Sequence, residues 1–66
     1  MNKLLRLRII EIWDNQANFA QELGVSDSIV SGVVRGRRRL SPEMQDMWAQ
    51  KLQSTPEALG LREYHK

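Results

Sequence analysis

The sequence contains no cysteine, and its single histidine, His65, lies near the C-terminal end. Without cysteine the chain forms neither disulfides nor thiolate metal sites, and one histidine does not supply the ligands of a structural zinc. Aromatic residues are also few, with two tryptophans, one phenylalanine and one tyrosine. We therefore expect a fold held together by packing, with no metal and no cofactor.

The chain is also short. Its 66 residues have room for one domain, residues 1–66, and a fold of this size buries only about 60% of the surface of the unfolded chain. At about 0.05–0.15 kcal/mol per residue, its free energy of unfolding should be roughly 3–10 kcal/mol. So thin a core leaves no room for a deep pocket, and the residue spacing provides no pair of nucleophile and base. We expect neither an enzyme nor a small-molecule ligand.

Long hydrophobic runs are absent as well. The most apolar stretch, residues 1–13, is interrupted by Lys3, Arg6, Arg8 and Glu11, which is incompatible with a bilayer span. The stretch also lacks the small-residue cleavage site of a secretory signal. The sequence therefore predicts a soluble, cytoplasmic protein with no membrane partner.

The formal net charge is only +2, but the charges are unevenly distributed. Residues 1–39 carry seven Lys or Arg against four Asp or Glu, whereas the remaining residues carry three against four. Four arginines fall within residues 35–39. Such a run is typical either of a solvated loop or of a surface that binds an anionic partner.

Every segment between turn signals has helical periodicity. Asn15 and Ser26 are good N-caps, and Gly24 and Gly36 are placed to end the helices that precede them. The pattern N-cap, proline, glutamate occurs twice, beginning at Ser41 and at Thr55, and predicts a helix start each time. The expected helices are residues 3–13, 16–23, 27–35, a helix from Pro42 that includes Leu52, and a single turn that closes at Gly60.

The apolar residues of these helices define a candidate core. Its expected members are Leu5, Ile9, Ile12, Trp13, Phe19, Ala20, Leu23, Val30, Val33, Val34, Met44, Met47, Trp48 and Leu52. Leu4, Leu7 and Ile10 widen the apolar face of the first helix, which indicates burial on more than one side or a dimer contact. The third helix carries a second, small and polar stripe opposite its valines, formed by Ser28, Ser31, Gly32 and Arg35 at spacing i, i+3, i+4 and i+7.

Two short helices joined by a glycine turn are the geometry of a helix-turn-helix. Residues 16–31, QANFAQELGVSDSIVS, resemble the Cro and lambda-repressor type of this motif. Gln16 matches the glutamine that opens the family's second helix, Ala20 the alanine at the helix crossing, and residues 23–26 the Leu-Gly-Val-Ser turn. Val30 and Ser31, followed by Gly36, Arg37 and Arg38, match the rest of the recognition helix and its basic continuation, and residues 40–59 resemble the family's final helices.

The resemblance implies an all-α, five-helix, lambda-repressor-like bundle with the motif at about residues 16–35. It also implies a phage or prokaryotic transcriptional regulator, of the repressor type, that binds double-stranded DNA. Such proteins act as homodimers on inverted repeats, with recognition helices about 34–36 Å apart. Candidate dimer surfaces are the apolar face of the first helix and residues 59–64.

Two groups of residues are expected at the DNA. Those near base edges are Asp27, Ser28, Ser31 and Gly32, and those near phosphates are Asn15, Gln16, Ser26, Arg35, Arg37, Arg38 and Arg39. The family often has a base-reading glutamine at the position of Asp27 and a longer polar residue at that of Gly32, so direct base reading is expected to be sparse. Asp27 can accept from cytosine N4 or stabilise the helix start electrostatically.

A different class of function is a protein-interaction module, such as an antitoxin in which DNA binding is secondary. Ile29 and Val34 suggest it, because both border the stripe expected to face DNA. RNA binding is less favoured, since exposed aromatic residues for base stacking are lacking.

Overall fold

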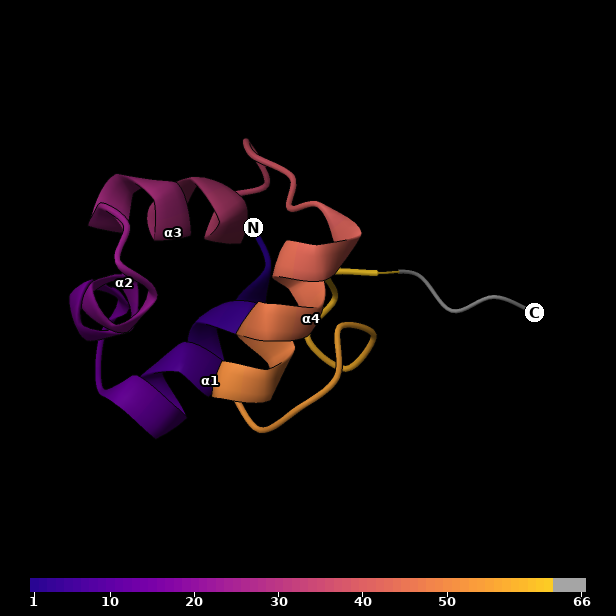
Figure 1. The fold of residues 1–66 in the computed structure, drawn as a ribbon, viewed down its shortest axis with the longest axis horizontal. Coiled ribbons are helices and arrows are strands. Elements are labelled where there is room, and N and C mark those ends of the chain that lie inside the picture. Colours follow the sequence, from indigo (N-terminus) through magenta and orange to yellow (C-terminus); the bar gives the residue numbers. More distant parts are fainter. Residues whose placement is uncertain (63–66) are drawn as a thin grey trace.

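The structure, a computed structural model, describes residues 1–62, so that Tyr64 and His65 lie outside the described part. It contains the α-helices α1 (Lys3–Trp13), α2 (Gln16–Leu23), α3 (Asp27–Val34) and α4 (Pro42–Lys51), and no strand in these residues. In Figure 1, α3 and α1 lie on opposite sides of the core, and α2 and α4 close the other two sides. The prediction of an all-helical fold is confirmed. None of the helices in residues 1–62 is long and apolar enough to cross a membrane.

Side-chain caps explain why three of the helices begin where they do. The Oδ1 atoms of Asn2 and Asn15 accept from the backbone N–H groups of Leu5 and Asn18 at 3.1 and 2.8 Å. Ser41 Oγ accepts from the N–H of Met44 at 3.3 Å, directly before the proline that begins α4. Each cap satisfies a donor that the first helical turn leaves free.

Three details differ from the sequence-based expectation. Ser26 precedes α3 but makes no side-chain cap, because its Oγ lies 2.9 Å from Ser28 Oγ instead. The third helix ends at Val34, one residue early. The predicted fifth helix is wrong: residues 56–60 form a hydrogen-bonded turn, in which the N–H of Leu59 donates to Thr55 O at 3.1 Å. A single turn has too few hydrogen bonds to propagate as a helix.

Gly24 makes the turn between α2 and α3 possible. Its φ of 74° and ψ of 27° lie in the left-handed region, which is costly for residues with a Cβ. Its N–H donates to Gln21 O at 3.2 Å, and the N–H of Val25 donates to Ala20 O at 3.1 Å. These are the two hydrogen bonds of a Schellman motif, which satisfies the last carbonyls of α2 and redirects the chain into α3.

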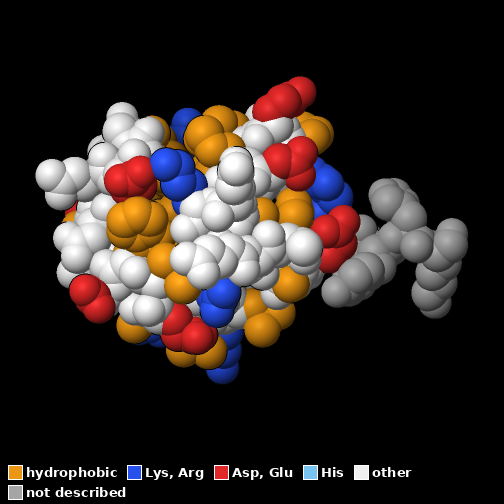
Figure 2. Space-filling view, turned by 60° about the horizontal axis from the view of Figure 1, so that its bottom comes forward, with side chains coloured by type: hydrophobic (Ala, Val, Ile, Leu, Met, Phe, Trp, Pro, Cys, Tyr) orange, Lys and Arg blue, Asp and Glu red, His pale blue; other side chains and the backbone are white. Residues whose placement is uncertain are grey.

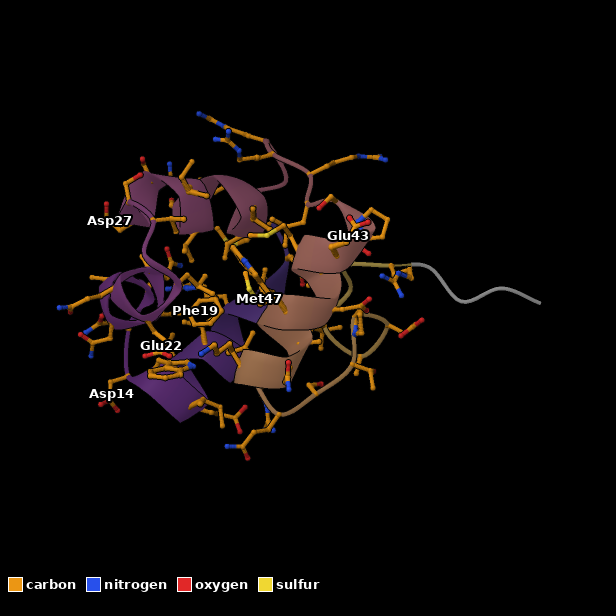
Figure 3. The ribbon with its side chains drawn as sticks, in the orientation of Figure 1. Asp14, Phe19, Glu22, Asp27, Glu43 and Met47 are labelled. Atoms are coloured by element: carbon orange, nitrogen blue, oxygen red, sulfur yellow. The ribbon has the colours of Figure 1, made fainter. Side chains whose placement is uncertain are left out.

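Phe19 occupies the middle of the core. It is fully buried and meets the ring of Trp48 edge to face, with ring centroids 5.1 Å apart. The ring of Trp13 is also near Phe19, at a centroid distance of 6.1 Å, and Figure 3 shows Phe19 and Met47 both pointing inward between α2 and α4. The three aromatic rings therefore connect α1, α2 and α4.

Polar contacts fasten α4 to α1 and α2. Arg8 Nε donates to Leu52 O at 2.8 Å and its NH2 group to Gln53 O at 3.0 Å, so that the guanidinium caps the C-terminal end of α4. Trp13 Nε1 donates to Lys51 O at 3.3 Å, and Lys51 Nζ lies 2.7 Å from a carboxylate oxygen of Glu22. Arg8 therefore has a structural role, because it holds the end of α4 against α1.

Asn2 joins three segments that are distant in sequence. Its backbone N–H donates to Val34 O at 2.7 Å, and its Nδ2 donates to Leu59 O at 2.8 Å. Gly60 packs directly against this side chain, since an added Cβ would lie 3.1 Å from Asn2 Nδ2, and its φ of 70° is itself left-handed. The start of α1 is thus tied to the end of α3 and to the turn after α4.

We expect Gly24→Ala to lower the melting temperature. No atom lies within 4 Å of an added Cβ, so the effect is conformational, at about 1–2 kcal/mol for a left-handed residue, or roughly 4–8 °C per kcal/mol in a domain of this size. Thermal denaturation followed by circular dichroism measures it. Gly32→Ala, at a helical position, is the matched control and should shift the melting temperature upward; equal shifts would contradict the assigned role of the turn.

Candidate nucleic-acid interface

Packing, rather than helix propensity, holds α3 in place. Its sequence DSIVSGVV contains β-branched residues and a glycine, which have low helix propensity. Val30, Val33 and Val34 are 0–5% exposed and join the core around Phe19 and Trp48. Because these valines fix the rotation of α3 about its axis, the residues on the opposite stripe are held toward the surface.

That outer stripe forms a nearly flat surface. Asp27, Ser28 and Arg35 are exposed, whereas Ser31 and Gly32 are half-buried. Asp27 lies at the N-terminal end of α3, and Figure 3 shows it away from the core. Between the two ends of the stripe the surface consists of small side chains and backbone, which permits the close approach of a flat or grooved partner.

Residues of three helices meet beside this stripe. Gln16, Ser31 and Arg35 line one shallow hollow of about 190 Å³ together with Arg6 of α1. Gln16 is the first residue of α2, where backbone N–H groups without helical partners favour anions. The structure therefore brings together three of the residues predicted near DNA and adds a fourth, cationic one.

The arginine run borders the other side of the stripe. Gly36, with a φ of 79°, turns the chain after α3, and the N–H groups of Arg37 and Arg38 both donate to Gly32 O, at 2.9 and 3.2 Å. The Cβ of Arg38 lies 3.6 Å from the position a Cβ on Gly32 would take. In Figure 3 the side chains of this loop, tipped with nitrogen, project from the top of the molecule beyond α3.

Most cationic groups near α3 have no hydrogen-bond or ion-pair partner among residues 1–62. Arg62 is held by Gln45 Oε1 at 2.9 Å and Asp46 Oδ1 at 3.3 Å, as Arg8 is held by α4. Within residues 1–62 five other arginines make neither a side-chain hydrogen bond nor an ion pair to another residue: Arg6, Arg35, Arg37, Arg38 and Arg39. All five are exposed. Their charges remain available to an external anion.

Two of the predicted phosphate contacts are partly occupied within the fold. Asn15 Oδ1 caps α2, so that only its amide Nδ2 remains free for an external acceptor. The hydroxyl groups of Ser26 and Ser28 are hydrogen-bonded to each other, so that only one of the two can at the same time donate to a phosphate oxygen.

The underside of the molecule has a different character. Figure 2, in which the bottom of Figure 1 is turned forward, shows acidic and basic side chains intermingled, with hydrophobic side chains between them. The arginine loop lies at the opposite, upper end of Figure 1. The underside in Figure 2 thus lacks a run of basic side chains like that of residues 35–39.

Sequence reasoning missed Arg6. Arg6 is far from Gln16 and Arg35 along the chain, and only the packing of α1 beside α2 and α3 brings it to their hollow. The burial of Leu59 was also misjudged, because this residue, predicted within a dimer surface, is only 2% exposed. Val34, expected both in the core and beside the outer stripe, is 2% exposed and so belongs to the core.

Comparison of the chain with models of protein families, with curated proteins and with solved structures finds no match.

Proposed function

We propose that the protein binds double-stranded DNA by using α2, the Gly24 turn and α3 as a helix-turn-helix, with α3 in the major groove. The observation that carries the proposal is the position of free arginines beside an outer stripe of small residues on α3: Arg6 and Arg35 line one hollow with Ser31, and Arg38 lies next to Gly32. An α-helix such as α3, about 10–12 Å in diameter with its side chains, fits a major groove about 12 Å wide.

Within this proposal the stripe and its borders have different tasks. Ser28, Ser31 and the backbone at Gly32 face the base edges, where serine discriminates little between bases. Phosphates are bound by the arginines after α3, and by Gln16 with Arg6 on the other side. Affinity then comes mainly from charge, and part of the sequence preference comes from DNA shape.

The resemblance of residues 16–31 to the Cro and lambda-repressor type extends the proposal to regulation of transcription. A protein that occupies an operator in this way blocks or redirects RNA polymerase. The competing interpretation, a protein-interaction module, loses one of its two supporting residues because Val34 is buried; Ile29 remains half-exposed.

The first test is fluorescence anisotropy with a random-sequence duplex at low salt. We expect binding at or below micromolar protein, since non-specific affinity is about 10⁻⁴–10⁻⁶ M at physiological salt and rises as salt is lowered. No binding under these conditions would exclude the DNA-binding function and leave the interaction module. Selection of bound duplexes from a random pool would then show whether the preferred site is an inverted repeat.

Arg38→Ala should weaken binding to all duplexes alike. Loss of one phosphate contact flattens the slope of log K against log salt concentration by about one unit, which titrations at several salt concentrations measure. Arg38→Lys keeps the charge and should keep the slope. Lys51→Gln removes the same charge where Lys51 pairs with Glu22 and should also leave the slope unchanged. A loss confined to one sequence would contradict a phosphate role for Arg38.

Gly32→Ala should raise the stability of the fold but weaken binding to DNA. The added Cβ makes only an ordinary contact of 3.6 Å with Arg38, so helix propensity should raise stability by about 1 kcal/mol. The same methyl group projects from the stripe that faces the bases and should weaken duplex binding several-fold. Gln50→Ala, at an exposed position of α4, is the control for binding. Unchanged affinity of the Gly32 variant would show that α3 does not approach DNA closely at this point.

A further inference from the structure

The outer side of α1 carries a row of exposed hydrophobic residues. Leu4, Leu7 and Ile10 are 60%, 58% and 42% exposed, although Leu5 and Ile9 on the opposite side of the helix are fully buried. The core therefore covers only one of the two apolar faces of α1, whereas a surface helix normally has a single apolar face. We refer to Leu4, Leu7 and Ile10 as the α1 row.

A shallow hollow lies beside the α1 row. Its volume is about 400 Å³, and its lining includes Leu4, Leu7, Ser54 and Ala58, so it runs between α1 and the chain that follows α4. Apolar side chains on one wall and room beside them allow a side chain from another molecule to pack there.

The sequence of α1 is self-complementary about Leu7. Residues 3–11 read KLLRLRIIE. Residues at the same distance before and after Leu7 are of the same class, except that Lys3 and Glu11, at the two ends, have opposite charges. At about 100° per residue, Lys3 and Glu11 lie about 40° on either side of Leu7 around the helix, on the same face as the α1 row and at its two ends.

We propose that α1 pairs antiparallel with α1 of a second copy of this chain, about a two-fold axis at Leu7. In this register Leu7 meets Leu7 of the second copy, and Leu4 lies level with Ile10. Lys3 lies level with Glu11 of the second copy, and by symmetry Glu11 lies level with Lys3. The contact is isologous, as in most closed dimers.

The charges on α1 favour an antiparallel second copy of the chain over a parallel copy or a membrane surface. A parallel pairing would set Lys3 against Lys3 and Glu11 against Glu11, which is repulsive. A membrane surface attracts apolar helices with basic flanks, whereas Glu11 and Asp14 both lie on the exposed side of α1 and its end. Glu11 is 64% exposed and reaches Arg8 only at 3.7 Å, so its carboxylate can also bind a lysine of a second copy.

The pairing has a consequence for the candidate nucleic-acid interface. A two-fold axis perpendicular to both antiparallel helices keeps equivalent flanks of α1 on the same side of the pair. One flank carries Arg8, which is bound to α4, and the other carries Arg6, which lines the hollow with Gln16 and Arg35. Both interfaces then open on one side, as an inverted-repeat duplex requires. This step rests on the proposed function, whereas the pairing itself does not.

Sedimentation equilibrium of the whole chain without DNA, from micromolar to several hundred micromolar, tests the pairing. We expect a concentration-dependent dimer, weak because one helix pair buries less than a standard interface of about 1,600 Å². Leu7→Glu places two carboxylates at the axis and should raise the dissociation constant at least about tenfold. Gln50→Glu adds the same charge on exposed α4 and should leave it unchanged. A wild-type chain that stays monomeric, or a dimer insensitive to Leu7→Glu, overturns the proposal.

Charge exchange tests the antiparallel register with variants that keep the α1 row intact. Lys3→Glu and Glu11→Lys alone should each raise the dissociation constant about tenfold, because symmetry changes two ion pairs at once. The double variant should restore the wild-type value, and the two single variants should pair with each other when mixed. Failure of the double variant to recover excludes this register.

These measurements are independent of the duplex titrations. A dimer that binds no duplex would support the pairing and overturn the proposed function. Duplex binding by a chain that stays monomeric would do the reverse. Circular dichroism melting of each variant shows that the fold is retained, as expected for substitutions at exposed positions.

Discussion

The edge-to-face contact between Phe19 and Trp48 is the interaction on which the arrangement of the helices depends. Phe19 belongs to α2 and Trp48 to α4, and both side chains are fully buried. Without this contact α4 would lose its aromatic connection to α2, and the core on which the valines of α3 pack would be much smaller. Since α3 consists largely of poor helix formers, its shape and its orientation both derive from this core. The candidate interface is therefore a product of tertiary packing.

The helix boundaries could be read from the sequence where a local chemical signal marks them. Asn15, Gly24 and the Ser41–Pro42 pair act within a few residues of themselves, and each lies where the structure uses it. The signal at Thr55 has the same form but gives only a turn, because too few residues follow it before Gly60. Local signals predict where a helix can start; the number of hydrogen bonds that follow decides whether it persists.

The residues that surround the candidate site were harder to predict from the sequence than the stripe on α3 at its centre. The stripe on α3 follows from a 3.6-residue period, which sequence provides directly. The contribution of Arg6 follows from the way α1 passes the start of α2, and nothing within α1 predicts it. The same limit applies to Leu59, which was expected at a surface but is buried in the core.

The hydrogen bonds of Asn2 to Val34 and Leu59 affect the order in which the protein folds and unfolds. Most contacts that define α1, α2 and α3 join near neighbours in sequence, whereas Asn2 bonds to Leu59, 57 residues away, and Arg8 to Leu52, 44 residues away. Closing such long loops costs more chain entropy than forming the Gly24 turn. The first three helices are therefore expected to form first, and α4 with the following turn to dock later. On heating we expect the hydrogen bonds of Asn2 to open before those of Gly24, so that hydrogen exchange begins where Asn2 meets Leu59.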